Sequence, residues 1–152
     1  MTIRKMTLKD YPAVSGMMEA LHRLHVESRP DLFTQTMCEN FQEKYEEMIQ
    51  DDTCIPLLAE ENGLPLGFCI LYIQEPRGIM LQKSAHMDDL FVAENARRKG
   101  VAKKLYREAQ LRARAAGAAH MTLKVWAFNE PAIAFYRSMG MKVRSYFLEK
   151  EL

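Results

Sequence analysis

A short basic segment stands between a predicted strand, Ala85–Val92, and a predicted helix, Gly100–Ala116, and its composition suits anion binding. The spacing Arg97-x-x-Gly100-x-Ala102 sets small residues at a helix N-terminus, where backbone N–H groups lack partners and attract phosphate. Five cations surround it: Arg97, Arg98, Lys99, Lys103 and Lys104. The segment is neither a P-loop nor a Gly-x-Gly-x-x-Gly fingerprint, which disfavours nucleotide hydrolysis. A solvated basic helix start is the alternative interpretation.

Candidate proton acceptors lie close to this segment. Asp88 and Asp89 are neighbours on the predicted strand, so their side chains point to opposite faces and only one of them can reach a given site. Glu94 and Glu130 are the less favoured bases. An exposed, solvated aspartate pair fits the same sequence, so the identity of the base stays open.

The segment Arg97–Ala102 resembles the [Arg/Gln]-x-x-Gly-x-[Gly/Ala] signature of the GCN5-related N-acetyltransferase (GNAT) superfamily, where it holds the pyrophosphate of acetyl-coenzyme A (acetyl-CoA). Upstream, Asp89-Leu90-Phe91-Val92 is similar to that family's fourth strand, which ends in valine before the loop. Downstream, Asn129-x-x-Ala132-x-x-Phe135-Tyr136-x-x-x-Gly140 is similar to its next helix. The resemblance is specific over residues 88–141 and weaker, although consistent in order, before them.

This resemblance implies an enzyme that transfers an acetyl group from acetyl-CoA directly to a primary amine of a small molecule, peptide or protein. By resemblance, the backbone of Leu90, Phe91 and Val92 pairs with the pantetheine arm, and Asn129 reaches the same arm, serves as a helix N-cap, or does both through different atoms. The implied pyrophosphate-binding residues are Arg97, Arg98, Lys99, Gly100, Val101, Ala102 and Lys103. No metal site is expected.

Tyr136 is the predicted catalytic acid, because the family uses a tyrosine here to give a proton to the departing thiolate. A packing stripe with Ile133 and Met139 is the alternative role for its ring. The resemblance also implies a backbone N–H near Leu90 or Phe91 as the oxyanion donor. Since family members often deprotonate the amine through water, neither Asp88 nor Asp89 need be indispensable.

Hydrophobic periodicity predicts a single domain over residues 1–152, without a linker or repeat. Together with the resemblance, it predicts an α/β (α+β) GNAT fold. This is a mixed, mostly antiparallel twisted sheet of six to seven strands, splayed between the fourth and fifth, with about four helices on its faces. The expected strands are Ile3–Met6, Thr53–Glu60, Leu66–Ile73, Ala85–Val92, His120–Trp126 and Val143–Phe147, and the expected helices run from Asp10 to about His25, Thr36–Gln50, Gly100–Ala116 and Asn129–Met139.

The sequence specifies the amine acceptor less well than it specifies the cofactor-binding residues. Eight acids and one lysine occupy Glu39–Glu61, which favours a cationic amine on electrostatic grounds, although the outer face of an acidic helix explains them equally well. The candidate acceptor-pocket residues are Phe33, Tyr72, Trp126 and Phe128. Small amines, polyamine-like compounds, aminoglycoside-like compounds, protein N-termini and lysine side chains all remain open as acceptors.

Composition and charge limit the classes of function that the chain can have. With 21 Lys and Arg against 20 Asp and Glu, the chain is nearly neutral, although residues 97–116 hold eight bases and one acid. Without base-stacking aromatics this helix is not expected to bind nucleic acid. No membrane span or secretory signal is expected, so a cytoplasmic protein is predicted. A non-catalytic acyl-CoA-binding sensor or structural module is the alternative function, and a homodimer is a plausible assembly.

Overall fold

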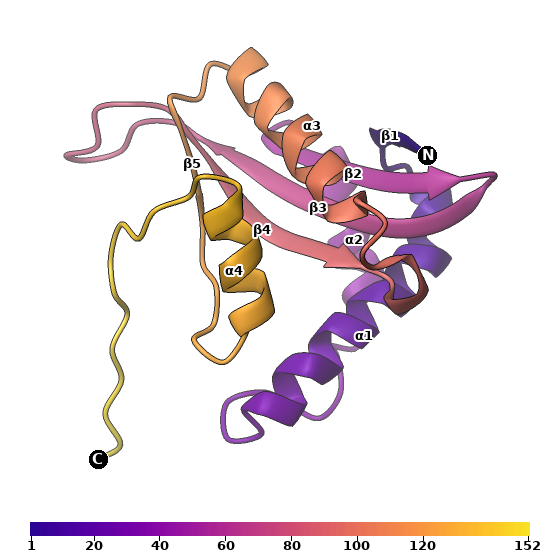
Figure 1. Cartoon of the computed structure of the whole chain (residues 1–152), viewed down its shortest axis with the longest axis horizontal. Helices are drawn as coiled ribbons and strands as arrows, with labels where there is room; N and C mark the ends of the chain where they lie inside the picture. Colours follow the sequence, from indigo (N-terminus) through magenta and orange to yellow (C-terminus); the bar gives the residue numbers. More distant parts are fainter.

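The computed structural model describes all 152 residues and shows one five-stranded sheet with helices on both faces (Figure 1). Its strands are β1 (Thr2–Lys5), β2 (Cys54–Glu61), β3 (Leu64–Gln74), β4 (Ser84–Val92) and β5 (His120–Leu123). Its helices are α1 (Tyr11–Ser28), α2 (Phe41–Gln50), α3 (Val101–Ala115) and α4 (Glu130–Ser138). Short 3-10 turns, η1 (Leu8–Asp10) and η2 (Glu94–Ala96), precede α1 and α3.

The strands follow their sequence order across the sheet, β1-β2-β3-β4-β5. The first four pair antiparallel, and β5 alone is parallel to its neighbour β4. β2 and β3 are joined by a tight hairpin turn, in which Asn62 and Gly63 have positive φ angles of 52° and 76° between the paired residues Glu61 and Leu64. The predicted mixed, mostly antiparallel sheet is therefore correct in kind.

The predicted number of six to seven strands is wrong, because Val143–Phe147 forms no strand. The chain leaves α4 at Gly140 with a positive φ of 89° and then has no regular structure. The fifth strand is also shorter than the predicted His120–Trp126. Its ladder with β4 ends at the pair Met87 and Leu123, and residues beyond that point have no partner strand to pair with.

Two apolar cores lie on opposite faces of the sheet. One packs α3 against β2, β3 and β4 through Leu57, Leu71, Met87 and Leu105, all buried. The other packs α1 and α2 on the opposite face through residues such as Val14, Tyr45 and Phe68. α4 joins the α3 side through Phe135, Tyr136 and Met139. No helix is both long and apolar enough to cross a bilayer.

Asp10 occupies the N-cap position of α1, but its carboxylate makes no capping hydrogen bond to that helix. It accepts the backbone N–H of Thr7 at 2.8 Å and two hydrogen bonds from the guanidinium of Arg4, at 2.7 and 2.8 Å. Arg4 also donates to Glu60 at 2.8 Å, which ties β1 and β2 to the start of α1. The hydrogen bond from Arg4 lowers the pKa of Asp10 from 3.8 to about 2.

Asp10→Asn is expected to lower the free energy of unfolding by about 1 to 2 kcal/mol at neutral pH, less than the roughly 2.4 kcal/mol of such a pKa shift, because solvent screens this partly exposed pair. Because the native pKa lies below the unfolded value, this stability is present above pH 4 and is lost as pH falls toward 2. Urea unfolding at several pH values measures it. Asp31→Asn is the control, since Asp31 also pairs with an arginine, Arg29, but lies exposed. Equal losses from both variants would contradict the argument.

Candidate active site

The sheet opens between β4 and β5. The two strands pair only from Ser84 and His120 to Met87 and Leu123, while β4 continues to Val92 paired with β3 alone. Backbone N–H and C=O groups on the outer side of residues 88–92 therefore have no strand partner. An extended ligand can pair with them as a further strand does. This opening lies where the splay was predicted.

A β-bulge at Asp88 helps to open the sheet. Asp89 pairs with Ile70 and Met87 pairs with Leu71, so Asp88 is an extra residue in β4. A bulge of this kind bends its strand and increases the local twist. β4 consequently leaves the direction of β5 at the start of the unpaired stretch.

Gly67 allows β3 to hold the far end of β4. It pairs with Val92, and a β-carbon at this position would lie 2.4 Å from the carbonyl oxygen of Phe91. No other residue fits so close to a neighbouring backbone without displacing it. The unpaired part of β4 thus gains a fixed position from the strand on its other side.

The basic segment after β4 leads into a helix start with free backbone donors. Gly100, with φ of 79°, is the N-cap residue of α3, and no side chain caps the helix. The first backbone N–H with a helical partner is that of Lys104, which donates to Gly100 at 3.1 Å. The amides of residues 101–103 are therefore free. Arg98 also has a positive φ, of 61°, which is uncommon for a residue with a side chain.

The cations of this segment form no ion pair, so their charge is available to an anion. This holds for Arg97, Arg98, Lys99, Lys103 and Lys104. The side chain of Arg97 folds back, and its Nε donates to the carbonyl oxygen of Val92 at 3.2 Å. This hydrogen bond places the Arg97 side chain against the end of β4.

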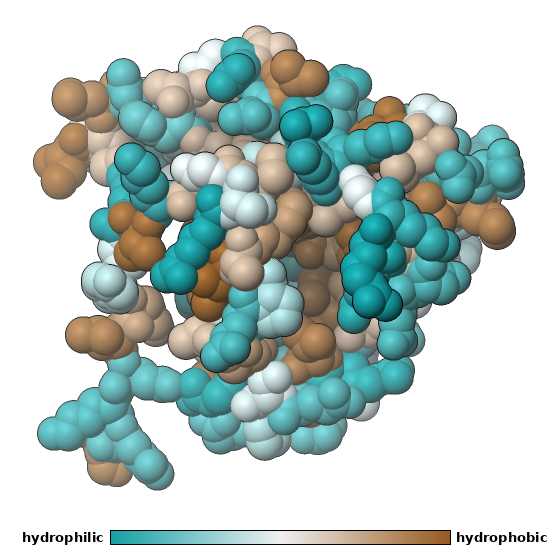
Figure 2. Space-filling model, viewed as in Figure 1, coloured by the Kyte–Doolittle hydropathy of each residue, from teal (hydrophilic) through white to brown (hydrophobic).

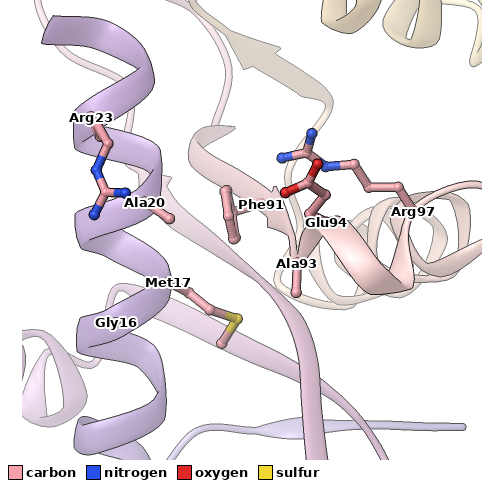
Figure 3. A pocket seen from close by; sticks show the side chains of 8 residues that line it. All are labelled: Gly16, Met17, Ala20, Arg23, Phe91, Ala93, Glu94 and Arg97. Carbon is pink, nitrogen blue, oxygen red and sulfur yellow. The ribbon is translucent and has the colours of Figure 1, made fainter. Parts of the chain in front are cut away.

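A groove of about 390 Å³ separates α1 from the end of β4 (Figure 3). Figure 3 shows Arg23 on the α1 wall, with Glu94 and Arg97 across from it and Phe91 between the walls. The lining residues on α1 are Gly16, Met17, Ala20 and Arg23. This wall was not predicted from the sequence. The sequence does hold a signal for it, because Gly16 and Ala20 are small residues four positions apart on one helix face and leave space beside the backbone.

The two aspartates of β4 have different surroundings. Asp88 is exposed, whereas Asp89 is half-buried and has neither an ion pair nor a hydrogen bond. Burial, and then the adjacent charge of Asp88, raises the pKa of Asp89 from 3.8 to about 6. A carboxylate with a pKa near neutrality is suited to accept and release protons.

Tyr136 lies on α4, partly buried among aromatic rings. Its ring centroid is 5.3 Å from that of Phe135 and 6.5 Å from that of Tyr106. Burial, and then Cys69, raises the pKa of Tyr136 above its ordinary value, and Asp89 contributes to the same rise. The phenol is therefore protonated at neutral pH. The packing role and the acidic role predicted for this residue are compatible, because the ring packs while its hydroxyl has no hydrogen-bond partner in the chain.

Asn129 occupies the N-cap position of α4, as one of its two predicted roles requires. Its Oδ1 accepts the backbone N–H of Ala132 at 3.2 Å. The Nδ2 amide remains uncommitted, so the residue retains a free donor. Glu130, an alternative base, is exposed at the start of α4, and Glu94 lines the groove.

Three of the four predicted acceptor-pocket aromatics gather at the end of α1. Phe33, Trp126 and Phe128 surround His25, with ring centroids 5.1 to 6.4 Å from that of the histidine. Tyr72 lies elsewhere, beside the α1–α2 core. Burial, and then the charge of His22, lowers the pKa of His25, which favours the neutral form of this imidazole.

The acidic helix and this aromatic cluster lie at opposite ends of α1. α2 packs through Phe41 and Tyr45 against Tyr11, in the first turn of α1, whereas His25 is near its last turn. The ammonium of Lys124 lies 5.0 Å from the centre of the Trp126 ring. The acids predicted to attract the acceptor are thus separated from the aromatic residues predicted to enclose it. Nowhere do three or more His, Cys, Asp or Glu residues form a group that could hold a metal ion.

Comparison with known proteins agrees with this geometry. Residues 18–141 match the sequence profile of the Acetyltransferase (GNAT) family. A peptidyl-lysine N-acetyltransferase, YjaB of Salmonella typhimurium, is 35% identical over 79 residues, which are 52% of this chain and 51% of the relative. The matched region therefore spans about half the length of that curated relative.

Two crystal structures share the fold over almost their entire length. A mutant of the BH1408 protein from Bacillus halodurans is 24% identical with a TM-score of 0.93, covering 100% of this chain and 99% of that one. The aminoglycoside N-acetyltransferase AAC(6')-Iy, in complex with CoA, is 19% identical with a TM-score of 0.74, covering 99% and 100%. With the family match over most of its length, the chain belongs to the Acetyltransferase (GNAT) family.

Proposed function

We propose that residues 1–152 form a single N-acetyltransferase domain that uses acetyl-CoA to acetylate a primary amine. The observation that carries this proposal is the continuity of the unpaired stretch of β4 with the free amides of α3. An extended arm and its terminal phosphates need these two features in this order. Family membership and the fold shared with a CoA-bound enzyme support it.

The residues of the opening fit such a ligand. Leu90, Phe91 and Val92 would offer backbone groups to the pantetheine arm, and Nδ2 of Asn129 a further donor. The pyrophosphate would meet the amides and cations of residues 97–103. The position where a β-carbon of Gly100 would lie has no atom within 4 Å, so the approach to these amides is open.

Acetyl-CoA supplies an acetyl group activated as a thioester. Asp89 accepts a proton from the amine, directly or through water, and its raised pKa of about 6 suits that role. A backbone N–H of Leu90 or Phe91 stabilises the negative charge that develops on the carbonyl oxygen. As the C–N bond forms and the C–S bond breaks, Tyr136 donates its proton to the departing sulfur.

The acceptor carries a primary amine, and its class is best found by assay. The related YjaB is named for peptidyl lysine, and a fold relative is named for aminoglycosides, so both kinds of amine belong in the panel. Thiol release from acetyl-CoA should exceed the rate without amine for at least one acceptor. CoA binding without release for any amine would indicate a non-catalytic acyl-CoA-binding module, and no CoA binding would contradict the proposal.

Arg98→Ala should weaken CoA binding about 10-fold in isothermal titration, because it removes a cation beside the free amides. Arg114→Ala is the matched control, an exposed arginine without an ion pair at the other end of α3. Alanine keeps the β-carbon of Arg98, so the backbone strain at this position is unchanged. Equal weakening by both variants would show only a general loss of positive charge.

A further inference from the structure

The groove between α1 and the end of β4 holds three charged side chains without ion-pair partners. Arg23 lies on the α1 wall, with Glu94 and Arg97 on the opposite wall (Figure 3). None of the three forms an ion pair within the chain. Two guanidinium groups against one carboxylate leave the groove with an excess of positive charge. A groove of this charge attracts an anionic group.

Arg23 is the cation of this groove that the cofactor does not require. Arg97 donates to the carbonyl oxygen of Val92 at 3.2 Å and borders the free amides of α3, where the proposed function places the pyrophosphate. Arg23 lies across the groove, exposed on α1. A guanidinium presents two parallel N–H donors that match the two oxygens of a carboxylate. Arg23 can therefore bind a carboxylate without breaking an ion pair.

The rest of the groove is apolar and small. Met17 and Phe91 line it between the charged groups. Gly16 and Ala20 leave room along α1, and a β-carbon on Gly16 would have no atom within 4 Å. The volume of about 390 Å³ lies near the lower end of the range for small-molecule sites, about 300 to 1,000 Å³. The groove therefore suits a small molecule with an apolar body and an anionic end.

Asp89 points to the same face of the sheet as this groove. It pairs with Ile70, and Phe91, two residues further along β4, pairs with Phe68. Paired residues share a face, and Ile70, Phe68 and Phe91 all belong to the core beneath α1. The carboxylate proposed as the base thus lies about 7 Å along the strand from the Phe91 position. Figure 2 shows the surface over β4 as a hollow, with apolar atoms in its depth and hydrophilic atoms along the loop to α3.

We propose that the acceptor is a small amino acid-like molecule, whose amine lies at Asp89 and whose carboxylate is bound by Arg23 across the apolar floor of the groove. This inference rests on the proposed acetyl transfer and names the class of its acceptor. The carboxylate takes no part in bond making or breaking, so its role is to orient the amine. A polycation such as an aminoglycoside would bring further positive charge to Arg23 and Arg97, which disfavours it in this groove.

Thiol release with free amino acids and with their α-carboxamides tests the proposal, because each amide keeps the amine and lacks the carboxylate. Arg23→Gln should lower the ratio of kcat/KM for acid to amide about 10- to 100-fold, since a charge-assisted pair is lost. Comparing this ratio between variants cancels the different basicity of the two amines. Arg23→Lys should lower it less, because the charge remains without the planar fork. Arg107→Gln is the control, an exposed arginine of α3 outside the groove, and should leave the ratio unchanged.

Isothermal titration of the same acids and amides into wild type and Arg23→Gln needs no turnover. Binding of the acids that depends on Arg23, without thiol release, would support the groove and contradict acetyl transfer. Acetylated amines with an unchanged acid-to-amide ratio in Arg23→Gln would overturn the groove and leave acetyl transfer standing. CoA should bind Arg23→Gln as tightly as wild type. A loss of CoA affinity would show that Arg23 holds a phosphate of CoA instead, which would also overturn the proposal.

Discussion

Tyr136→Phe is expected to lower kcat about 100- to 10,000-fold while leaving CoA affinity unchanged, because only the donated proton is lost. The phenylalanine ring preserves the contacts with Phe135 and Tyr106. The hydroxyl makes no hydrogen bond in the chain, so its removal leaves no buried partner unsatisfied. Steady-state kinetics, together with titration of CoA, separates the two effects.

Tyr106→Phe is the matched control for this variant. Tyr106 lies on α3 beside Tyr136, is 3% exposed, and also has its pKa raised by burial. It is not assigned a proton transfer, so its loss should leave kcat nearly unchanged. If both variants lost activity equally, the effect would come from packing between α3 and α4. Unchanged turnover in Tyr136→Phe would remove that residue from the mechanism.

Asp89→Asn should have the second large effect, a loss of about 100-fold in kcat/KM at neutral pH. The pKa of Asp89, raised to about 6 by burial and by Asp88, predicts that wild-type activity falls as pH drops below 6. The variant cannot titrate there, so this acid limb should disappear from its pH–rate profile. A profile with the same limb in the variant would assign the base elsewhere.

Asp89→Asn, which should lower activity, should raise the free energy of unfolding. The native pKa of Asp89 lies above the ordinary 3.8, so the folded protein binds this proton more tightly than the unfolded chain does. The free energy of unfolding therefore falls as pH rises from about 4 to 6, and the carboxylate costs about 1 to 3 kcal/mol at neutral pH. Asp89→Asn should recover much of this cost in urea unfolding.

Asp88→Asn provides the control for both measurements. Asp88 is the exposed extra residue of the bulge, and its charge contributes to the rise in the pKa of Asp89. Its removal should shift the acid limb slightly to lower pH without abolishing it. If Asp88→Asn lost as much activity as Asp89→Asn, the two carboxylates would act as a unit.

Much of the site was predictable because its signals are local. The turn at Asn62 and Gly63, the N-cap at Asn129 and the helix start at Gly100 each depend on backbone preferences of a few residues. The splay followed from resemblance, and the structure shows its cause in the bulge at Asp88. No pattern in the sequence predicts this bulge, since nothing in the run from His86 to Leu90 distinguishes an extra residue from a paired one.

The features that sequence analysis missed depend on distant parts of the chain. The α1 wall of the groove exists because Gly16 and Ala20 face the end of β4, a contact that periodicity cannot place. Asp89 was ranked no higher than Asp88, because half-burial is a tertiary property. Val143–Phe147 has the composition of a strand, but strand formation requires a partner edge, which the single chain does not bring to it.

The order of the strands also bears on how the protein folds. β1 can pair with β2 only after the long segment that holds α1 and α2 has closed between them. β2, β3 and β4 are consecutive, so they can form as neighbouring hairpins with little loop-closure cost. β5 arrives only after the chain has closed through the basic loop and α3. The opening that we assign to acetyl-CoA therefore lies between the part of the sheet that assembles locally and the strand that joins through a long-range step. The site is therefore complete only when β5 has joined the sheet and the whole fold has formed.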